Sequence, residues 1–169
     1  LVSSMVMFWA RSVTLPAAPV NLTAQVNYQI ELDWDYAYLT VNGAPVATNL
    51  SVNTNPNGQN FGNGITGASS DWDALTADLS AFAGQTMTLG FRYWTDGAVA
   101  EPGFGVDAIA INGAAVGDNE TPAGWTFDGF KTTTGTESNS YFNAYVLENR
   151  NSVEYDNGLK TGPYNFGFL

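Results

Sequence analysis

Three carboxylates alternate along one short segment of the chain, at Glu31, Asp33 and Asp35. In an extended backbone, residues two apart point to the same side, so these three side chains would share one face. Three like charges this close repel one another unless a cation lies among them. Calcium is the cation that fits best, because it accepts about six to eight oxygen ligands in a flexible geometry. The alternative is that the three acids are solvated at the end of a strand.

Two further aspartates lie in patterns that could involve a ligand. Asp107 lies within the apolar run 105–111, where an unpaired carboxylate costs several kcal/mol. A metal ion or a salt bridge to Arg92 would offset this cost, and a solvent-facing position would avoid it. Asp96 precedes Gly97, so it could bind a ligand or simply cap a turn.

The chain contains neither His nor Cys. It therefore has no thiol nucleophile, no disulfide, no H-E-x-x-H zinc motif and no base for a Ser–His–Asp triad. Two carboxylates can hydrolyse a glycosidic bond, but in a chain with 16 acidic residues a pair is no signal by itself. We expect this chain to hold no zinc and no catalytic residues, and not to be an enzyme on its own.

The charge of the chain restricts its partners. The 16 acidic residues against 5 basic ones give a net charge of −11. Nucleic acid is not an expected partner, because binding it requires a basic face that neutralises phosphates. No apolar run reaches the roughly 20 residues that span a membrane. The acids could also serve only as a solvated surface that keeps the protein soluble.

The order of the predicted elements indicates an all-β chain. Aromatic residues make up 14% of the sequence, and aromatic residues favour strands. Residues 21–30 alternate apolar and polar side chains, which is typical of a half-buried strand. A long surface loop is predicted at residues 53–70, where Asn, Gly, Ser and Thr are frequent. Further strands are predicted at residues 6–10, 36–41, 86–94, 105–111, 125–130, 141–150 and 164–168.

Strands at this spacing, separated by turn residues, predict an antiparallel β-sandwich of jelly-roll type. We expect the sandwich to occupy residues 1–113 and a linker to occupy residues 114–124. Residues 125–169 would form an additional β region, either a truncated second domain or strands that complete the sandwich.

Exposed aromatic residues are the sequence's second possible binding feature. Trp34, Trp72 and Trp94 could present their rings to a sugar, as in carbohydrate-binding modules. Trp residues in a β-sandwich more often support the core or a hairpin.

Several segments of the chain resemble, in order and spacing, motifs of the immune inhibitor A-type metallopeptidases. These are residues 30–38 (IELDWDYAY), residues 67–72 (GASSDW) with 78–85 (DLSAFAGQ), residues 91–99 (FRYWTDGAV) and residues 103–109 (GFGVDAI). Residues 145–151 and 155–159 resemble the segment that follows in that family. The resemblance covers residues 22–169.

The resemblance implies a MAM-like, concanavalin-like jelly-roll that lies downstream of a catalytic domain with the H-E-x-x-H motif. By analogy with such jelly-rolls, the implied calcium ligands are Glu31, Asp33, Asp35, Asp96 and Asp107. Ala108 departs from the family, which tends to have a second acid there.

The implied function is that of a non-catalytic, calcium-stabilised accessory domain of a secreted, extracellular bacterial zinc metallopeptidase. Its partners would be the catalytic domain of the parent peptidase and a protein substrate or a glycan. Two alternatives remain open. The chain could be a glycan- or matrix-binding or adhesin module, or a structural subunit of an extracellular assembly.

Overall fold

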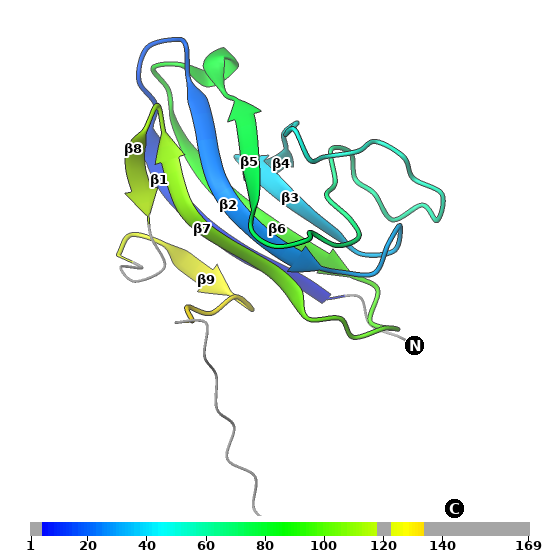
Figure 1. The fold of residues 1–169 in the computed structure, drawn as a ribbon. Helices are drawn as coiled ribbons and strands as arrows, with labels where there is room; N and C mark the ends of the chain where they lie inside the picture. The colour runs from blue at the N-terminus through cyan, green and yellow to red at the C-terminus, as the bar shows by residue number, and fades with distance from the viewer. Residues whose placement is uncertain (1–4, 118–122, 134–169) are drawn as a thin grey trace, which may run out of the picture. The chain divides into compact units, whose positions relative to one another are not determined.

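The computed structural model describes residues 5–117 and 123–133 of the 169-residue chain (Figure 1). Nearly all regular structure in these residues is β-strand, with one short 3-10 helix, η1 (Ser80–Phe82). No helix among these residues is long and apolar enough to cross a membrane. The strands are β1 (Met5–Thr14), β2 (Asn21–Gln29), β3 (Tyr36–Val41), β4 (Ala44–Pro45), β5 (Asp73–Asp78), β6 (Thr86–Thr95), β7 (Gly103–Ile111), β8 (Ala114–Gly117) and β9 (Thr126–Asp128).

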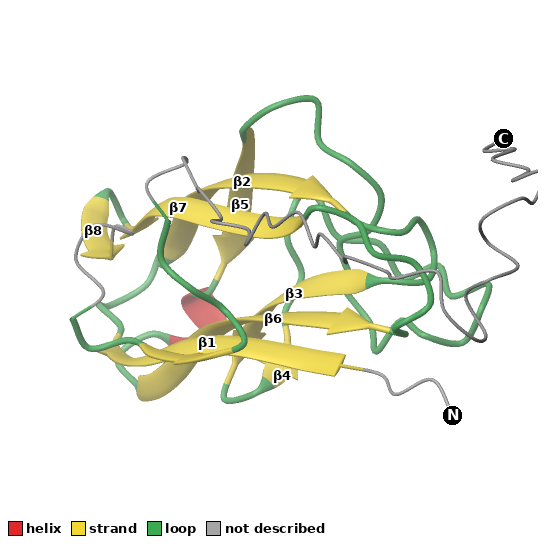
Figure 2. Cartoon of the chain, turned by 90° about the horizontal axis from the view of Figure 1, so that it is seen from below, coloured by secondary structure: helices red, strands yellow, loops and turns green. Residues whose placement is uncertain are grey.

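The strands form two antiparallel sheets that lie one above the other (Figure 2). The five-stranded sheet has the order β4-β3-β6-β1-β9, and the four-stranded sheet has the order β5-β2-β7-β8. Every strand pair in both sheets is antiparallel. The all-β antiparallel sandwich predicted from the sequence is confirmed.

The alternating pattern of β2 places one face of the strand in the core. Leu22, Ala24 and Val26 are at most 2% exposed, whereas their odd-numbered neighbours are exposed. Side chains on a strand alternate between its two faces, so the apolar set packs between the sheets and the polar set faces outward. The outward set consists of Asn21, Thr23, Gln25, Asn27 and Gln29.

Strand β3 is buried on both faces. Its core side carries Ala37 and Leu39, while Tyr36 and Tyr38 form a separate buried cluster with Trp94 of β6. The loop predicted at residues 53–70 covers this cluster: the backbone N–H of Phe61 donates to the hydroxyl of Tyr38 at 3.1 Å. The second face of the strand is therefore shielded from water by a loop rather than by a sheet.

Asn60 holds that loop together. Its Nδ2 donates to the carbonyls of Val52 and Thr54 at 2.9 and 3.0 Å, and its Oδ1 accepts from the backbone of Gly62 at 2.9 Å. Gly64 passes so close to the cluster that a Cβ at this position would lie 2.5 Å from the Tyr36 ring and 2.7 Å from Oδ1 of Asn60.

The outer edge of β5 has a polar partner. The backbone N–H of Asn49 donates to the carbonyl of Thr76, and its side-chain Oδ1 accepts from the Thr76 N–H at 2.7 Å. Its Nδ2 also donates to the carbonyl of Ala74 at 2.9 Å. One asparagine thus satisfies three backbone groups along this sheet edge.

Elements after residue 113 add to both sheets. Strand β8 pairs with β7, although its residues were expected to begin a linker, and β9 pairs with β1 through Trp9 and Ala10. The predicted strands at residues 141–150 and 164–168 lie outside the described residues. The predicted domain boundaries stay a prediction.

A candidate metal centre at one end of the sandwich

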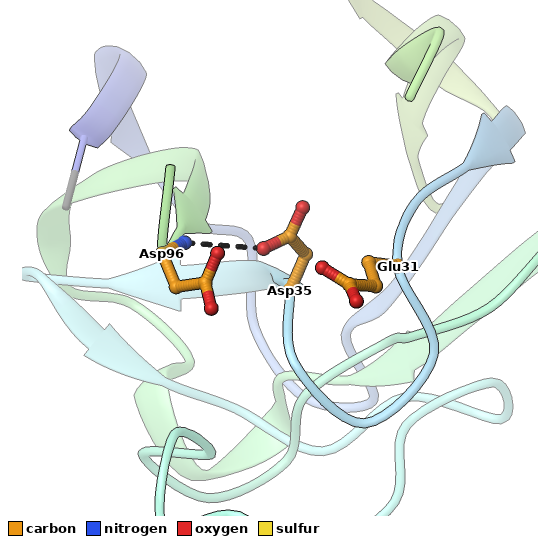
Figure 3. Close-up of side chains that lie close together, drawn as sticks. All are labelled: Glu31, Asp35 and Asp96. Atoms are coloured by element: carbon orange, nitrogen blue, oxygen red, sulfur yellow. Dashed lines mark hydrogen bonds between the residues drawn. The ribbon is translucent and has the colours of Figure 1, made fainter. Parts of the chain in front are cut away.

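Three acidic side chains, two from one turn and the third from a distant strand end, meet at one end of the sandwich. Glu31 follows β2, Asp35 precedes β3, and Asp96 follows β6. Strands β3 and β6 are antiparallel neighbours, with Tyr36 opposite Trp94, so the start of one lies beside the end of the other. Figure 3 shows the three carboxylates pointing toward one another. One oxygen from each lies within 4.8 Å of the others.

A tight turn, rather than an extended strand, brings the first two acids together. The backbone N–H groups of Trp34 and Asp35 both donate to the carbonyl of Glu31, at 3.3 and 2.9 Å. Asp33 has a φ of 63°, in the left-handed region. The expectation of an extended segment at residues 31–35 is therefore wrong. In this turn the backbone brings residue i close to residue i+4, so the side chains do not alternate between two faces as they would in a strand.

Asp33 is not part of the three-acid group. Its backbone N–H donates to Oγ1 of Thr66 at 2.8 Å, and that hydroxyl donates to the carbonyl of Glu31 at 3.3 Å. Thr66 thereby fixes the turn from outside. The role of Asp33 in the structure is to occupy the left-handed position that lets the turn close, which Asp tolerates better than most residues.

Asp35 is the buried member of the group, with no exposed surface. Its Oδ2 accepts a hydrogen bond from the Tyr93 hydroxyl at 3.0 Å, and its Oδ1 accepts from the backbone N–H of Asp96 at 3.2 Å. Burial, the hydrogen bond to Asp35 and the charge of that carboxylate all raise the pKa of Tyr93. Tyr93 therefore stays protonated and acts as a fixed donor to the carboxylate.

Glu31 is the member with unmet hydrogen-bonding capacity. Its Oε2 is buried and has no hydrogen-bond partner among the described residues. Desolvation raises the pKa of Glu31 above its ordinary value of 4.5, and the negative charges of Asp96, Asp35 and Glu101 raise it further. The centre thus gathers negative charge around an oxygen that nothing in the described part of the chain satisfies.

These residues fit a hard divalent cation. Carboxylate oxygens are the preferred ligands of calcium, which binds them at about 2.3–2.6 Å and accepts both mono- and bidentate carboxylates. A cation at this position would neutralise the repulsion at Glu31 and give its free oxygen a partner. Zinc fits less well, because its sites are usually built from Cys and His, which the chain lacks.

Asp107 lies apart from this centre. It is in β7, in register with Gln25, on the outer face of the four-stranded sheet. Its Oδ1 accepts from the backbone N–H of Ala108 at 2.7 Å, next to a shift in register and a φ of 50° at Ala108. Of the five predicted ligands, the structure brings together Glu31, Asp35 and Asp96.

Arg92 does not form the salt bridge to Asp107 that was considered from the sequence. Its guanidinium lies over the rings of Tyr38 and Phe61, at 4.6 and 5.2 Å from their centroids. It therefore belongs to the outer face of the five-stranded sheet, whereas Asp107 lies on the opposite sheet. Asp107 instead takes the solvent-facing position that was one of the alternatives.

The three predicted ligand-facing tryptophans differ in exposure. Trp34 and Trp72 are 38% and 48% exposed. Trp94 is 8% exposed and packs edge-on against Phe61 at 5.7 Å. Only the first two rings are accessible to a ligand in solution.

Tyr93 and Glu101 were not among the site residues predicted from the sequence. Tyr93 lies on the same face of β6 as Met87, Leu89 and Phe91, so its position in the strand indicates a core residue. Only the contact with Asp35 shows its second role. The one feature of the sequence that could have indicated this role is that Tyr93 lies near the end of a strand, three residues before Asp96.

Comparison with known proteins places the sandwich in a family. A family model described as "Immune inhibitor A-like, MAM domain" matches residues 5–135. The chain belongs to this family of MAM domains. The resemblance stated from the sequence motifs is thereby confirmed.

The relatives that match this MAM domain are much longer than the chain. The chain is 35% identical over 156 residues to the pre-pro-metalloprotease PrtV of Vibrio cholerae serotype O1 (strain M66-2). The aligned residues cover 89% of this chain and 17% of the relative. It is 34% identical over 105 residues to immune inhibitor A of Bacillus thuringiensis subsp. alesti. Here the aligned residues cover 58% of this chain and 15% of the relative. The chain thus spans less than a fifth of the curated relatives it matches.

Proposed function

We propose that this MAM domain is a non-catalytic accessory domain of a secreted zinc metallopeptidase and that calcium at Glu31, Asp35 and Asp96 stabilises it. The convergence of three carboxylates around the unpartnered Oε2 of Glu31 carries the ion assignment. The metalloprotease names of its relatives support the parent assignment. The absence of His supports a non-catalytic role, because a zinc peptidase site of the H-E-x-x-H type needs it.

The position of the centre explains how an ion would stabilise the fold. Glu31 follows β2 of the four-stranded sheet, while Asp35 and Asp96 flank strands of the five-stranded sheet. An ion bound by all three ties the two layers together at the end where β2 crosses to β3. Because the site exists only in the folded chain, calcium adds about 2.7 kcal/mol at a hundredfold excess over its Kd.

Thermal unfolding of the full chain, with excess calcium and with chelator, tests the ion assignment. Calcium should raise the melting temperature by about 5–10 °C for a chain of this size. Glu31→Gln should abolish most of the rise, while Asp33→Asn and Asp107→Asn, which remove the same charge outside the centre, should keep it. If the calcium-induced rise in melting temperature survives Glu31→Gln but is lost in Asp107→Asn, the ion binds near Asp107 and the proposed centre is wrong.

The accessory role has its own test, in the parent protein. Glu31→Gln in the full-length peptidase should leave the rate on a short peptide unchanged in excess calcium, because the domain holds no catalytic residue. Its half-life at elevated temperature should shorten. A loss of peptide hydrolysis without loss of stability would mean that the domain takes part in catalysis.

A further inference from the structure

The outer face of the four-stranded sheet is polar and open. Along β2 it carries the exposed side chains of Gln25, Asn27 and Gln29. The neighbouring strand β7 places Gly103 and Gly105 opposite Gln29 and Asn27, so no side chain rises beside these amides from that strand. The result is a shallow surface with amide groups along its middle.

Trp72 lies across this surface. It precedes β5, whose first residue, Asp73, is paired with Val26, so Trp72 starts beside Asn27. The Cη2 atom of its ring would lie 3.7 Å from a Cβ built on Gly105, the residue paired with Asn27 on the far side of β2. The indole therefore reaches from the edge strand across β2 to β7. It is 48% exposed, as expected for a ring with one face on the sheet and the other in solvent.

Amide and carboxylate groups flank the ring on both sides along the strands. On one side, Nε2 of Gln29 donates to Oε2 of Glu101 at 3.0 Å. On the other side, Gln25 is paired in register with Asp107. Asn27, Gln29, Trp72 and Glu101 are among the residues that line one hollow of about 760 Å³, and Lys131 and the inward-facing Tyr93 line it as well.

We propose that this face is a saccharide-binding site with Trp72 as its stacking platform. The apolar C–H face of a pyranose ring packs on an exposed indole, and the ring hydroxyls both donate and accept hydrogen bonds. Carboxylates supply acceptors and amides supply both donors and acceptors, so the Gln29–Glu101 pair and the Gln25 and Asp107 side chains match adjacent hydroxyls. A few convergent polar groups beside an aromatic surface are the usual composition of a small-ligand site.

The charge of the surface selects among saccharides. Glu101 and Asp107 flank the platform, Asp71 and Asp73 adjoin Trp72 in sequence, and the whole chain carries a net charge of −11. Lys131 lines the same hollow, but the carboxylates around Trp72 outnumber it, so uronate or sulfated polymers would be repelled. The ligand class is therefore a neutral hexose polysaccharide, with several sugar units laid along the row of β2 amides.

Affinity electrophoresis of the full chain tests this site. The probes are soluble mixed-linkage β-glucan, amylopectin and galactomannan, with alginate as the anionic comparison. At least one neutral polymer should retard the chain, and alginate should not. Trp72→Ala should raise the Kd for that polymer about tenfold or more, the order expected when a stacking contact is removed. Gln29→Ala should raise it by a smaller factor.

Trp34→Ala is the matched control, because Trp34 is also exposed but lies in the turn at residues 31–35. Its affinity should equal that of the unchanged chain, and the melting temperature of each variant checks that it is folded. Retardation by no neutral polymer, retardation by alginate alone, or a Kd that Trp72→Ala leaves unchanged would each overturn the proposal. Glu101 contributes negative charge at both sites, but Trp72 and the amides of β2 lie outside the ion centre, so Glu31→Gln should bind the polymer normally in excess calcium.

Discussion

The Tyr93 hydroxyl donates a 3.0 Å hydrogen bond to Oδ2 of Asp35, a carboxylate with no exposed surface. The bond joins an inward-facing residue near the end of β6 to the residue that precedes β3. It orients the buried member of the acid centre before any ion binds. If a buried carboxylate loses such a donor, no hydrogen bond offsets the free-energy cost of its desolvation.

Tyr93→Phe should therefore destabilise the calcium-free chain by about 1–3 kcal/mol, because it removes the hydroxyl and leaves Asp35 Oδ2 without a donor. Urea unfolding in chelator measures this difference. Tyr28→Phe is the control, since Tyr28 is a buried core tyrosine whose hydroxyl makes no hydrogen bond with the described residues. Equal losses in the two variants would show that the bond to Asp35 adds nothing beyond packing.

The raised pKa of Glu31 predicts how stability depends on pH. Without calcium, the folded chain holds the Glu31 proton more tightly than the unfolded chain does. This contribution is fully present below the unfolded pKa and is lost as the pH rises through the raised folded value. With saturating calcium the order reverses, because the ion requires the ionised carboxylate and proton binding competes with it.

Unfolding free energies across this window, in chelator and in calcium, measure the effect. Relative to the unchanged chain, Glu31→Gln should remove the loss of stability on raising the pH in chelator. A difference between the two chains that is independent of pH would show that Glu31 titrates normally in the fold.

Gly64→Ala should destabilise the fold by about 1–3 kcal/mol, the usual cost of forcing extra volume into a packed site. The new methyl group would lie 2.5 Å from the Tyr36 ring, and the buried ring has little room to move. Gly105→Ala is the control, since its Cβ would lie 3.4 Å from the nearest atom. Chemical denaturation of both variants decides whether the close approach of the loop to β3 is as tight as the geometry indicates.

Asn60→Ala should loosen the loop over the β3 cluster, because it removes the partners of three backbone groups. The expected loss is about 2 kcal/mol, from hydrogen bonds to partly buried groups. Limited proteolysis within residues 53–63 should become faster than in the unchanged chain. Asn57→Ala, which removes a single exposed bond to the carbonyl of Asp33, should be cleaved at the original rate.

The strands could be predicted from the sequence where one face is buried and the other is wet. Residues 21–30 alternate because β2 lies between core and solvent, and the observed β3 has the predicted bounds of residues 36–41. Strand β5 was missed as a strand, since Ala and Thr on a short edge give a weak pattern. The burial of β3 on both faces depends on a loop folding back, which no local pattern reports.

The candidate centre could be predicted only in part. The composition of residues 31–35 indicates clustered acids, but which of them converge depends on whether the backbone is extended or turned. The left-handed φ of Asp33 and the hydroxyl of Thr66, 33 residues away in the chain, decide that. Asp107 shows the converse, because a carboxylate in an apolar run can face solvent when its strand has one wet side.

Asn49 has a consequence for a domain embedded in a long polypeptide. Exposed strand edges invite neighbouring chains to add a strand of their own. Along β5, the carbonyls of Ala74 and Thr76 and the Thr76 N–H already bond to this one residue. A strand from another chain could pair with β5 only after displacing these hydrogen bonds of Asn49. This edge of the four-stranded sheet is therefore protected against intermolecular strand addition.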